Sequence, residues 1–259
     1  SARGLCIPEP DMDMMMDALK QLLLLEKDWV PSSPGTSLYI RPTVIATDSF
    51  LGVRPSKTYR FFIILSPVGA YYPEGFNPVK IWVSKEHVRA VRGGVGEYKT
   101  AGNYAASLYA SAKANEAGYA QVLWLDGVQL KYIEEVGAMN IFFQIGDELV
   151  TPELNGSILP GITRDSVIRL AERWDMKISE RLVSIDEVVD AGKAGALKEV
   201  FGTGTAAVIS PVGELKYADD ILEVGDGKPG PLAVQFYNEL TGIQYGTRPD
   251  AENWVKVVG

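Results

Sequence analysis

The sequence predicts an α+β protein with two lobes, and three observations support this fold class. The chain has 259 residues, of which 46% are hydrophobic, enough for one large or two modest folded units. Strand-like segments dominate and do not alternate regularly with helical ones, which favours an α+β or barrel-like core over a doubly wound sheet. Glycine and proline concentrate in "GAYYPEGFNP", as in a connector. We therefore expect a small α/β lobe at 1–70, a connector at 71–79 and a larger barrel-like lobe at 80–259.

The small lobe is expected to begin with an amphipathic helix. Apolar residues follow Asp11 at helical spacing: Met15, Leu19, Leu22 and Leu23. This pattern predicts a helix that is capped by Asp11, ends near residue 28 and places its methionines in the core. The segments "SLYIRPTVIATD" and "TYRFFIILSPV" then predict two strands of one sheet, because they are rich in β-branched and aromatic residues.

The large lobe is predicted from alternating and clustered apolar segments. Strands are expected in "VKIWVS", "AQVLWLDG", "KYIEEVGAMNIFFQIG", "DELVTP", "KISERLVS" and "EVFGTGTAAVISPVGELKY". Helices are expected at 103–117, 164–174, 185–191 and 231–241. Only two or three strands precede the connector, so the small lobe is expected to lack N-terminal strands.

Composition excludes several classes of function. The net charge of −8 argues against a nucleic-acid-binding face and against a polybasic membrane patch. Cys6 and His87 are the only residues of their kinds, so an internal disulfide and a multi-cysteine or multi-histidine metal site are excluded. The longest apolar run, 60–72, is interrupted by Pro67 and Gly69 and is too short to span a membrane. The first residues lack a secretory signal, and we expect a cytoplasmic protein.

Lys99 lies in "VGEYKTAGNY", among small residues just ahead of a predicted helix. A lysine that forms a Schiff base needs access and room for a flat cofactor, and small neighbours provide that room. A surface lysine is the commoner explanation of such a residue taken alone.

Two further segments suit an anion. In "ILPGITRDS" a Pro-Gly turn opens an amphipathic helix, whose first N–H groups can bind a phosphate. In "FGTGTAA" two glycines and two threonines offer hydroxyls and close backbone approach after a strand. The segment "FGTGTAA" lacks the lysine of a GxxxxGK[ST] nucleotide-binding loop, and "GGVGEY" at 93–98 is not GxGxxG, so neither ATP nor a dinucleotide is well supported. A simple helix start and a simple turn remain alternatives.

The strand segment "YIEEVGAMN" carries adjacent carboxylates at Glu134 and Glu135. Side chains alternate along a strand, so one of the two faces inward. A buried carboxylate requires a cationic partner, and a protonated pyridine nitrogen is suitable. A hydrated edge strand is about as plausible from this segment alone.

Together, in this order, these motifs resemble the branched-chain amino-acid aminotransferases of the fold type IV group of pyridoxal phosphate enzymes. The resemblance covers nearly the whole chain and includes "SLYIRPT", "SPVGAYY", "VRAVRGGVGEYKTAGNY", "QVLWLDG", "EEVGAMNIFF", "TPELNGSILPGITRDS", "EVFGTGTA" and "GIQYG". It implies a homodimer that transfers an amino group between leucine, isoleucine or valine and 2-oxoglutarate by a ping-pong route.

The resemblance also implies roles for individual residues. Lys99 would form the Schiff base with pyridoxal phosphate and move the substrate proton, and Glu135 would keep the pyridine nitrogen protonated. Leu159 would pack on the ring, and Tyr104 would hydrogen-bond near its phenolic oxygen. The phosphate would be bound by Arg89, the N–H groups of Ile162 and Thr163, and the Thr205 hydroxyl. The substrate would be bound by Tyr39, Arg41, Tyr71 and Ala206.

The chain departs from the family pattern in three places. Ala207 and Ser210 replace a redox-active CxxC of the animal members, and Ala138 replaces a threonine near the carboxylate. The third departure concerns the start of the chain. In the family, a segment before the position of Ser1 carries small-lobe strands and another phosphate-binding arginine, and we expect this chain to lack them. Alternatives are a D-amino-acid aminotransferase or an aminodeoxychorismate lyase of the same fold group, and a non-catalytic anion-binding or scaffold protein.

Overall fold

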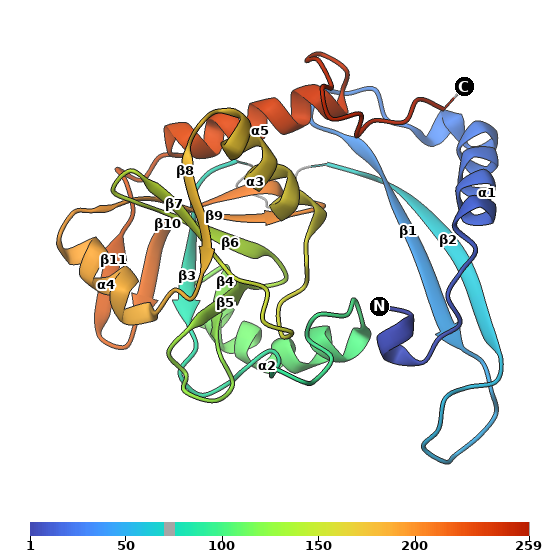
Figure 1. Ribbon diagram of the computed structural model, residues 1–259, viewed down its shortest axis with the longest axis horizontal. Helices are drawn as coiled ribbons and strands as arrows, with labels where there is room; N and C mark the ends of the chain where they lie inside the picture. The colour runs from blue at the N-terminus through green and yellow to red at the C-terminus, as the bar shows by residue number, and fades with distance from the viewer. Residues whose placement is uncertain (70–75, 259) are drawn as a thin grey trace. The chain divides into compact units, whose positions relative to one another are not determined.

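The computed structural model describes residues 1–69 and 76–258 (Figure 1). The chain divides into two compact units, Ser1–Pro73 with Ala251–Gly259, and Glu74–Asp250. The sequence placed the C-terminal residues in the large lobe, whereas here Ala251–Gly259 group with the first unit. Most of the predicted connector, from 71 to 75, lies outside the described residues.

The first unit consists of a helix and a long two-stranded ribbon. Helix α1 (Met12–Leu25) lies between two short 3-10 helices, Arg3–Leu5 and Lys27–Trp29. The Asp11 side chain accepts a hydrogen bond from the Met14 N–H at 3.0 Å, so the predicted cap is confirmed. Strands β1 (Ser37–Ala46) and β2 (Tyr59–Val68) pair antiparallel, with Ser37 opposite Val68 and Ala46 opposite Tyr59.

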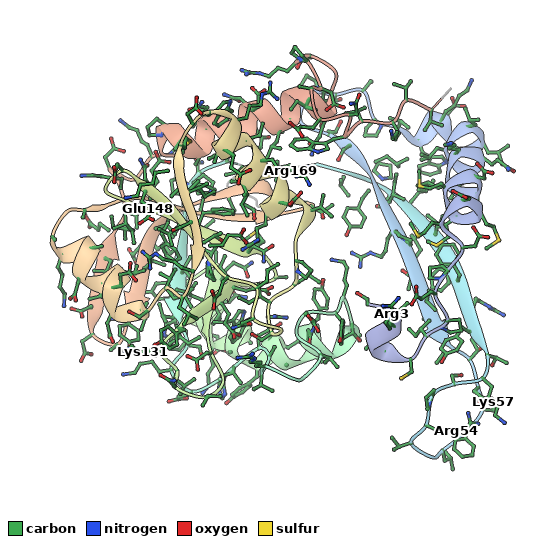
Figure 2. The ribbon with its side chains drawn as sticks, viewed as in Figure 1. Arg3, Arg54, Lys57, Lys131, Glu148 and Arg169 are labelled. Carbon is green, nitrogen blue, oxygen red and sulfur yellow. The ribbon has the colours of Figure 1, made fainter. Side chains whose placement is uncertain are left out.

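Little of the first unit is buried. Among its described residues no side chain is fully buried. The α1 residues Met15, Leu19, Leu22 and Leu23 are half-buried on one face, whereas Met12 and Met14 are each 62% exposed. The prediction that the methionines are core residues is therefore wrong for Met12, Met14 and Met16. Arg54, which Figure 2 labels in the β1–β2 loop, forms an ion pair with Asp48 at 2.7 Å.

The second unit is built on one mixed sheet. The hydrogen-bonded order is β5-β4-β3-β10-β9-β6-β7-β8, and β11 pairs with β10 outside this path. The pairs β3–β4, β3–β10 and β7–β8 are parallel and the others antiparallel. The strands are β3 (Val79–Val83), β4 (Gln121–Leu125), β5 (Ile133–Val136), β6 (Asn140–Ile145), β7 (Glu148–Pro152), β8 (Lys177–Arg181), β9 (Leu197–Gly204), β10 (Val208–Tyr217) and β11 (Asp220–Glu223).

Two predicted strand segments each fold into two strands. The segment 131–146 turns at Gly137, with Val136 bridging Met139, and forms β5 and β6. The segment 199–217 forms the hairpin β9–β10, and β11 was not predicted. Strands β5 and β6 are far apart in the hydrogen-bonded order but contact each other, so the sheet curls toward closure as expected of a barrel-like core.

All four predicted helices of this unit are present, with bounds that differ from the prediction by at most three residues. They are α2 (Ala101–Glu116), α3 (Ile162–Arg173), α4 (Ile185–Lys193) and α5 (Pro231–Gln244). Helix α2 packs on β4, while α3 and α5 pack on β9 near the other side of the sheet (Figure 1). The core includes Trp124, Phe142, Phe143, Phe201 and Phe236, all fully buried. Within the described ranges, no helix combines the length and apolarity that crossing a membrane requires.

Candidate active site

Lys99 lies in the loop that leads into α2. Its side chain is exposed, and its Nζ is 3.4 Å from the hydroxyl of Tyr104 in the first turn of that helix. The structure thus brings together two residues that the sequence predicted for one site. A phenol beside the amine can exchange a hydrogen bond with it and fix where it points.

Asn103 holds this loop in place, and sequence reasoning missed it. The side chain is 7% exposed, and its Nδ2 donates to the carbonyls of Val95 at 2.9 Å and Tyr98 at 2.8 Å. These bonds fold the residues before Lys99 back onto the start of α2. The signal in the sequence was an amide side chain four residues after a candidate lysine, which by itself is common.

Gly96 allows the loop to pack against a second segment, 153–161. A Cβ at position 96 would overlap the carbonyl of Ser157 and lie 2.6 Å from the Ala90 Cβ. Only glycine permits so close an approach of two backbones. This contact brings the Lys99 loop next to the segment that carries Leu159.

Glu135 is the buried acid of the site. It lies on β5, is 3% exposed, and accepts a hydrogen bond from the Leu159 N–H at 2.8 Å. Burial raises the pKa of Glu135 to about 7, because the Arg89 guanidinium and the Leu159 N–H offset only part of the desolvation. A carboxyl group with this pKa can hold or release a proton near neutrality.

Arg89 is the counter-ion of Glu135. Its Nε is 2.9 Å from Glu135 Oε2, a close ion pair that lacks the alignment of a hydrogen bond. Its Nη2 donates to the Ser157 carbonyl at 2.5 Å and lies 3.4 Å from the Gly96 carbonyl. The phosphate contact predicted for Arg89 stays a prediction, since these partners belong to the acid and the loop.

The predicted anion-binding segments meet around Asn140, which sequence reasoning also missed. Asn140 Nδ2 donates to the Leu159 carbonyl at 2.9 Å, and Asn140 pairs with Thr203 across β6 and β9. A Cβ on Gly161, the residue before α3, would overlap Asn140 Oδ1. The start of α3 and the end of β9 are therefore neighbours, which is the arrangement that a shared anion would require.

The described residues leave the α3 start without a side-chain cap, so its first N–H groups are available to a ligand. Ile162 and Thr163 form this first turn, and Ile162 is 80% exposed. Thr205 and Ala206 lie exposed in the turn between β9 and β10.

One pocket gathers five of the predicted cofactor residues: Arg89, Lys99, Tyr104, Glu135 and Leu159. Asn103, Gly137 and Ala138 also line it, whereas Ile162, Thr163, Thr205 and Ala206 do not. Tyr39 and Arg41 belong to the first unit, where Arg41 Nη2 is 3.1 Å from the Tyr39 hydroxyl. Tyr71 lies outside the described residues.

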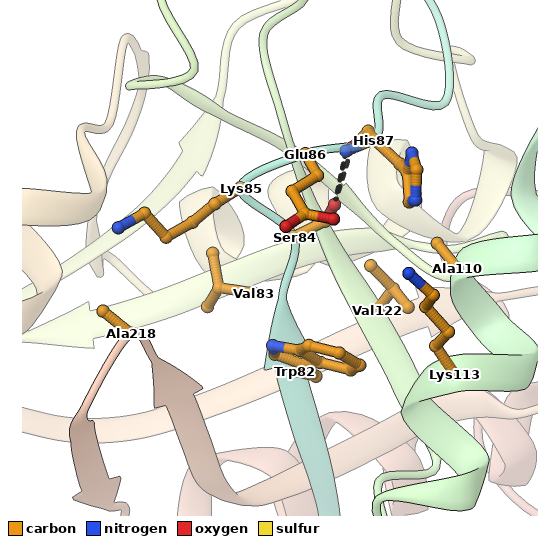
Figure 3. A pocket seen from close by; sticks show the side chains of 10 residues that line it. All are labelled: Trp82, Val83, Ser84, Lys85, Glu86, His87, Ala110, Lys113, Val122 and Ala218. Atoms are coloured by element: carbon orange, nitrogen blue, oxygen red, sulfur yellow. Dashed lines mark hydrogen bonds between the residues drawn. The ribbon is translucent and has the colours of Figure 1, made fainter.

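A larger pocket lies elsewhere, beside β3 and α2 (Figure 3). Trp82 and Val122 form part of its apolar wall, and Lys85, His87 and Lys113 line it as well. It contains none of the predicted site residues. Within the described ranges, no three His, Cys, Asp or Glu side chains are placed to hold a metal ion.

Comparison with known proteins decides the family. The model of the family described as amino-transferase class IV matches residues 1–215. The chain belongs to the class IV aminotransferases. Branched-chain-amino-acid aminotransferase 2 of Bacillus subtilis (strain 168) is 58% identical to it over 98% of this chain and 70% of the relative.

Solved structures agree with this class IV aminotransferase fold. Branched-chain amino acid aminotransferase from Escherichia coli matches with a TM-score of 0.82 at 28% identity, covering 100% of this chain and 80% of that one. The T.th. branched-chain amino acid aminotransferase, complexed with N-(5'-phosphopyridoxyl)-L-glutamate, matches with a TM-score of 0.81 at 26% identity over 100% and 79%. The predicted α+β architecture of the fold type IV kind is confirmed.

Proposed function

We propose that this chain is a pyridoxal-phosphate-dependent aminotransferase for leucine, isoleucine and valine, with 2-oxoglutarate as the second substrate in a ping-pong reaction. The observation that carries the proposal is the pocket in which the Lys99 amine, the Tyr104 hydroxyl and the buried Glu135 carboxyl converge. The names of the relatives and the phosphopyridoxyl-glutamate bound to the T.th. enzyme support it.

The residues present fit this cofactor. An accessible primary amine can bond an aldehyde, and a buried acid can face a ring nitrogen. The uncapped start of α3, next to the β9–β10 turn, can take a phosphate. When bound, pyridoxal phosphate supplies a carbonyl that exchanges amino groups and a pyridine ring that accepts electrons.

Each residue then has a chemical task. Lys99 Nζ takes and returns the proton of the substrate α-carbon, and Tyr104 directs this amine through its hydroxyl. Glu135 keeps a proton at the ring nitrogen, and Arg89 fixes the position of the Glu135 carboxyl. Leu159 would pack on the ring, while the N–H groups of Ile162 and Thr163 and the Thr205 hydroxyl would bind the phosphate.

The substrate contacts are also proposals. Tyr39, Arg41 and Tyr71 would form an aromatic and basic wall for the side chain, and the backbone near Ala206 would meet the α-carboxylate. An aromatic wall suits a branched aliphatic chain, and Arg41 suits the second carboxylate of glutamate. A homodimer and a cytoplasmic location complete the proposal.

The test compares Lys99→Ala with the control Lys131→Ala, which removes an exposed lysine elsewhere in the same unit (Figure 2). We expect Lys99→Ala to lose at least about a thousandfold in kcat, since a positioned acid–base group contributes about 10²–10⁴-fold and covalent attachment adds to it. Lys131→Ala should keep full activity. Transamination assays with a panel of L- and D-amino donors measure both the loss and the substrate class.

Two outcomes would contradict the proposal. One is an active Lys99→Ala variant, or a borohydride-reduced cofactor attached to another lysine. The other is a preference for D-amino donors, which would move the chain to the sibling activity of the same fold group.

A further inference from the structure

The second buried carboxyl, Glu134, belongs to a closed hydrogen-bond cluster with Asn155 and Ser157. Its Oε1 is within hydrogen-bond distance of Ser157 Oγ and 3.3 Å from Asn155 Nδ2. Ser157 Oγ also lies 2.6 Å from Asn155 Oδ1. The Ser157 hydroxyl thus has two oxygen neighbours.

The orientation of the Asn155 amide follows from the backbone. The Ser157 N–H donates to Asn155 Oδ1 at 3.0 Å. Exchanging the amide oxygen and nitrogen would point an NH₂ group at this N–H, leaving two donors face to face. Oδ1 is therefore the atom near Ser157, and Nδ2 is the atom near Glu134.

Counting protons around Ser157 Oγ determines the state of Glu134. The hydroxyl has one proton and can donate it to one oxygen only. Asn155 Oδ1 is always an acceptor. If Glu134 were ionised it would also be an acceptor, and one of the two oxygen–oxygen contacts would lack a proton. If Oε1 carries a proton, it donates to Ser157 Oγ while Ser157 donates to Asn155 Oδ1, and both contacts are satisfied.

The surroundings favour the neutral form as well. Glu134 is 2% exposed, and its Oε2 has no hydrogen-bond partner among the described residues, which costs less for a neutral carbonyl than for a charged oxygen. The charged groups that act on it are Arg89, Asp126 and Glu135. Burial raises the pKa of Glu134, and the bonds from Ser157 and Asn155 and the charge of Arg89 only partly oppose this rise.

We propose that Glu134 is a protonated, neutral carboxylic acid at neutral pH and is a positioning residue, which fixes Ser157 so that the Ser157 carbonyl holds Arg89 against Glu135. The chain of contacts runs from Glu134 through Ser157 to Arg89 Nη2, and from Arg89 Nε to Glu135. A neutral Glu134 leaves Arg89 as counter-ion to one carboxylate rather than two.

This positioning role rests on the proposed function, whereas the protonation state does not. Glu134→Gln is the decisive variant because its amide keeps a donor toward Ser157 Oγ and no charge. Glu134→Ala removes the donor and leaves a gap. Glu199→Gln is a matched control: Glu199 is 5% exposed, and its two oxygens accept from the N–H groups of Leu232 and Ala233, with no proton of their own in these contacts.

The first measurement is infrared difference spectroscopy of the full chain without added substrate, wild type minus Glu134→Gln, at neutral pH. We expect the carbonyl band of a protonated carboxylic acid to be present in the wild type and lost in Glu134→Gln. The Glu199→Gln difference should show loss of a carboxylate band instead. Loss of a carboxylate band in Glu134→Gln would overturn the proposal, and this result does not depend on whether the chain is an aminotransferase.

The second measurement is the pH profile of kcat/KM. Glu134→Gln should keep both the rate and the positions of the inflections in this profile, while Glu134→Ala should lower kcat/KM on the order of 10–100-fold, as for other supporting contacts. A fall in Glu134→Gln as large as in Glu134→Ala would overturn the proposal. So would a shift of an inflection to lower pH in Glu134→Gln, because it would mean that the substitution had removed a negative charge from the surroundings of the titrating group.

Discussion

Leu123 in β4 and Leu25 in α1 are residues of the same type that differ in solvent exposure. Leu123 is fully buried, and Leu25 is 81% exposed. This contrast holds for the whole of their units, since every buried core residue described lies between Val79 and Ile243, in the second unit. The second unit therefore supplies its own hydrophobic stabilisation, while the described first unit relies on ladder hydrogen bonds and half-buried side chains.

The site follows the same division. Lys99, Arg89 and Glu135, with the supporting residues Asn103 and Asn140, are all in the second unit, where close packing can hold them. The proposed substrate residues Tyr39 and Arg41 are in the first unit. The proposed catalytic residues thus belong to the unit with a packed core, and the proposed substrate residues to the unit with little buried surface.

The largest effect is expected from matched leucine truncations. Leu123→Ala should lower the free energy of unfolding by about 2–5 kcal/mol, because it leaves a cavity in a packed core. Leu25→Ala should change it by no more than about 0.5 kcal/mol, since its side chain already contacts water. Urea unfolding followed by circular dichroism measures both. A large loss in Leu25→Ala would show that another surface covers α1 in solution, which would break the contrast.

A smaller effect concerns the buried charge of the second unit. The pKa of Glu135 is raised to about 7 in the folded chain from 4.5, so between these values the folded state holds a proton that the unfolded state has lost. The contribution of Glu135 to the free energy of unfolding is therefore complete below the unfolded pKa and is lost as the pH rises through 7. This contribution amounts to about 3 kcal/mol. Urea midpoints between about pH 5 and about pH 8 should show this fall in the ligand-free wild type.

Glu135→Gln is the control for this pH dependence. It should remove the part of the fall that Glu135 contributes, because the amide does not titrate, and leave the part that comes from the raised pKa of Glu134. An equally steep fall in Glu135→Gln would assign the linkage to another group.

The smallest effect is expected from removing a helix cap, and each unit contains a helix with a side-chain cap. Asp11 caps α1 in the first unit, and Ser184 caps α4 in the second by accepting from the Glu187 N–H at 3.1 Å. Asp11→Ala and Ser184→Ala should each cost about 1 kcal/mol. Equal losses, measured by thermal unfolding, would show that α1 is as firmly folded as α4. No loss in Asp11→Ala would mean that α1 frays in solution.

Local patterns predicted much of the fold. The Asp11 cap, the β1–β2 ribbon and the four helices of the second unit follow from spacing and capping chemistry, which act over a few residues. The short β11 was missed because four residues at the end of a hairpin give little periodicity. The exposure of Met12 and Met14 was missed because burial of α1 depends on what packs against it, and its own pattern does not say.

The site was predicted only in part. Residue type and motif order pointed to Lys99, Tyr104, Glu135 and Leu159, and these do line one pocket. The roles of Asn103, Asn140 and Ser157 depend on contacts between segments far apart in sequence, which no local pattern contains. Strand alternation indicated one inward carboxylate, yet both Glu134 and Glu135 are buried, because the segment 153–161 provides partners for both.

The loop that carries Lys99 cannot accept a side chain at Gly96. Two chain segments touch at the Ser157 carbonyl only because residue 96 has no side chain. In a saturation library at position 96, selected in cells whose growth requires the activity of this protein, every codon other than those for glycine should be depleted. Gly93, which has a positive φ and open space around it, should accept asparagine or aspartate better than other residues, because these two adopt a positive φ more readily.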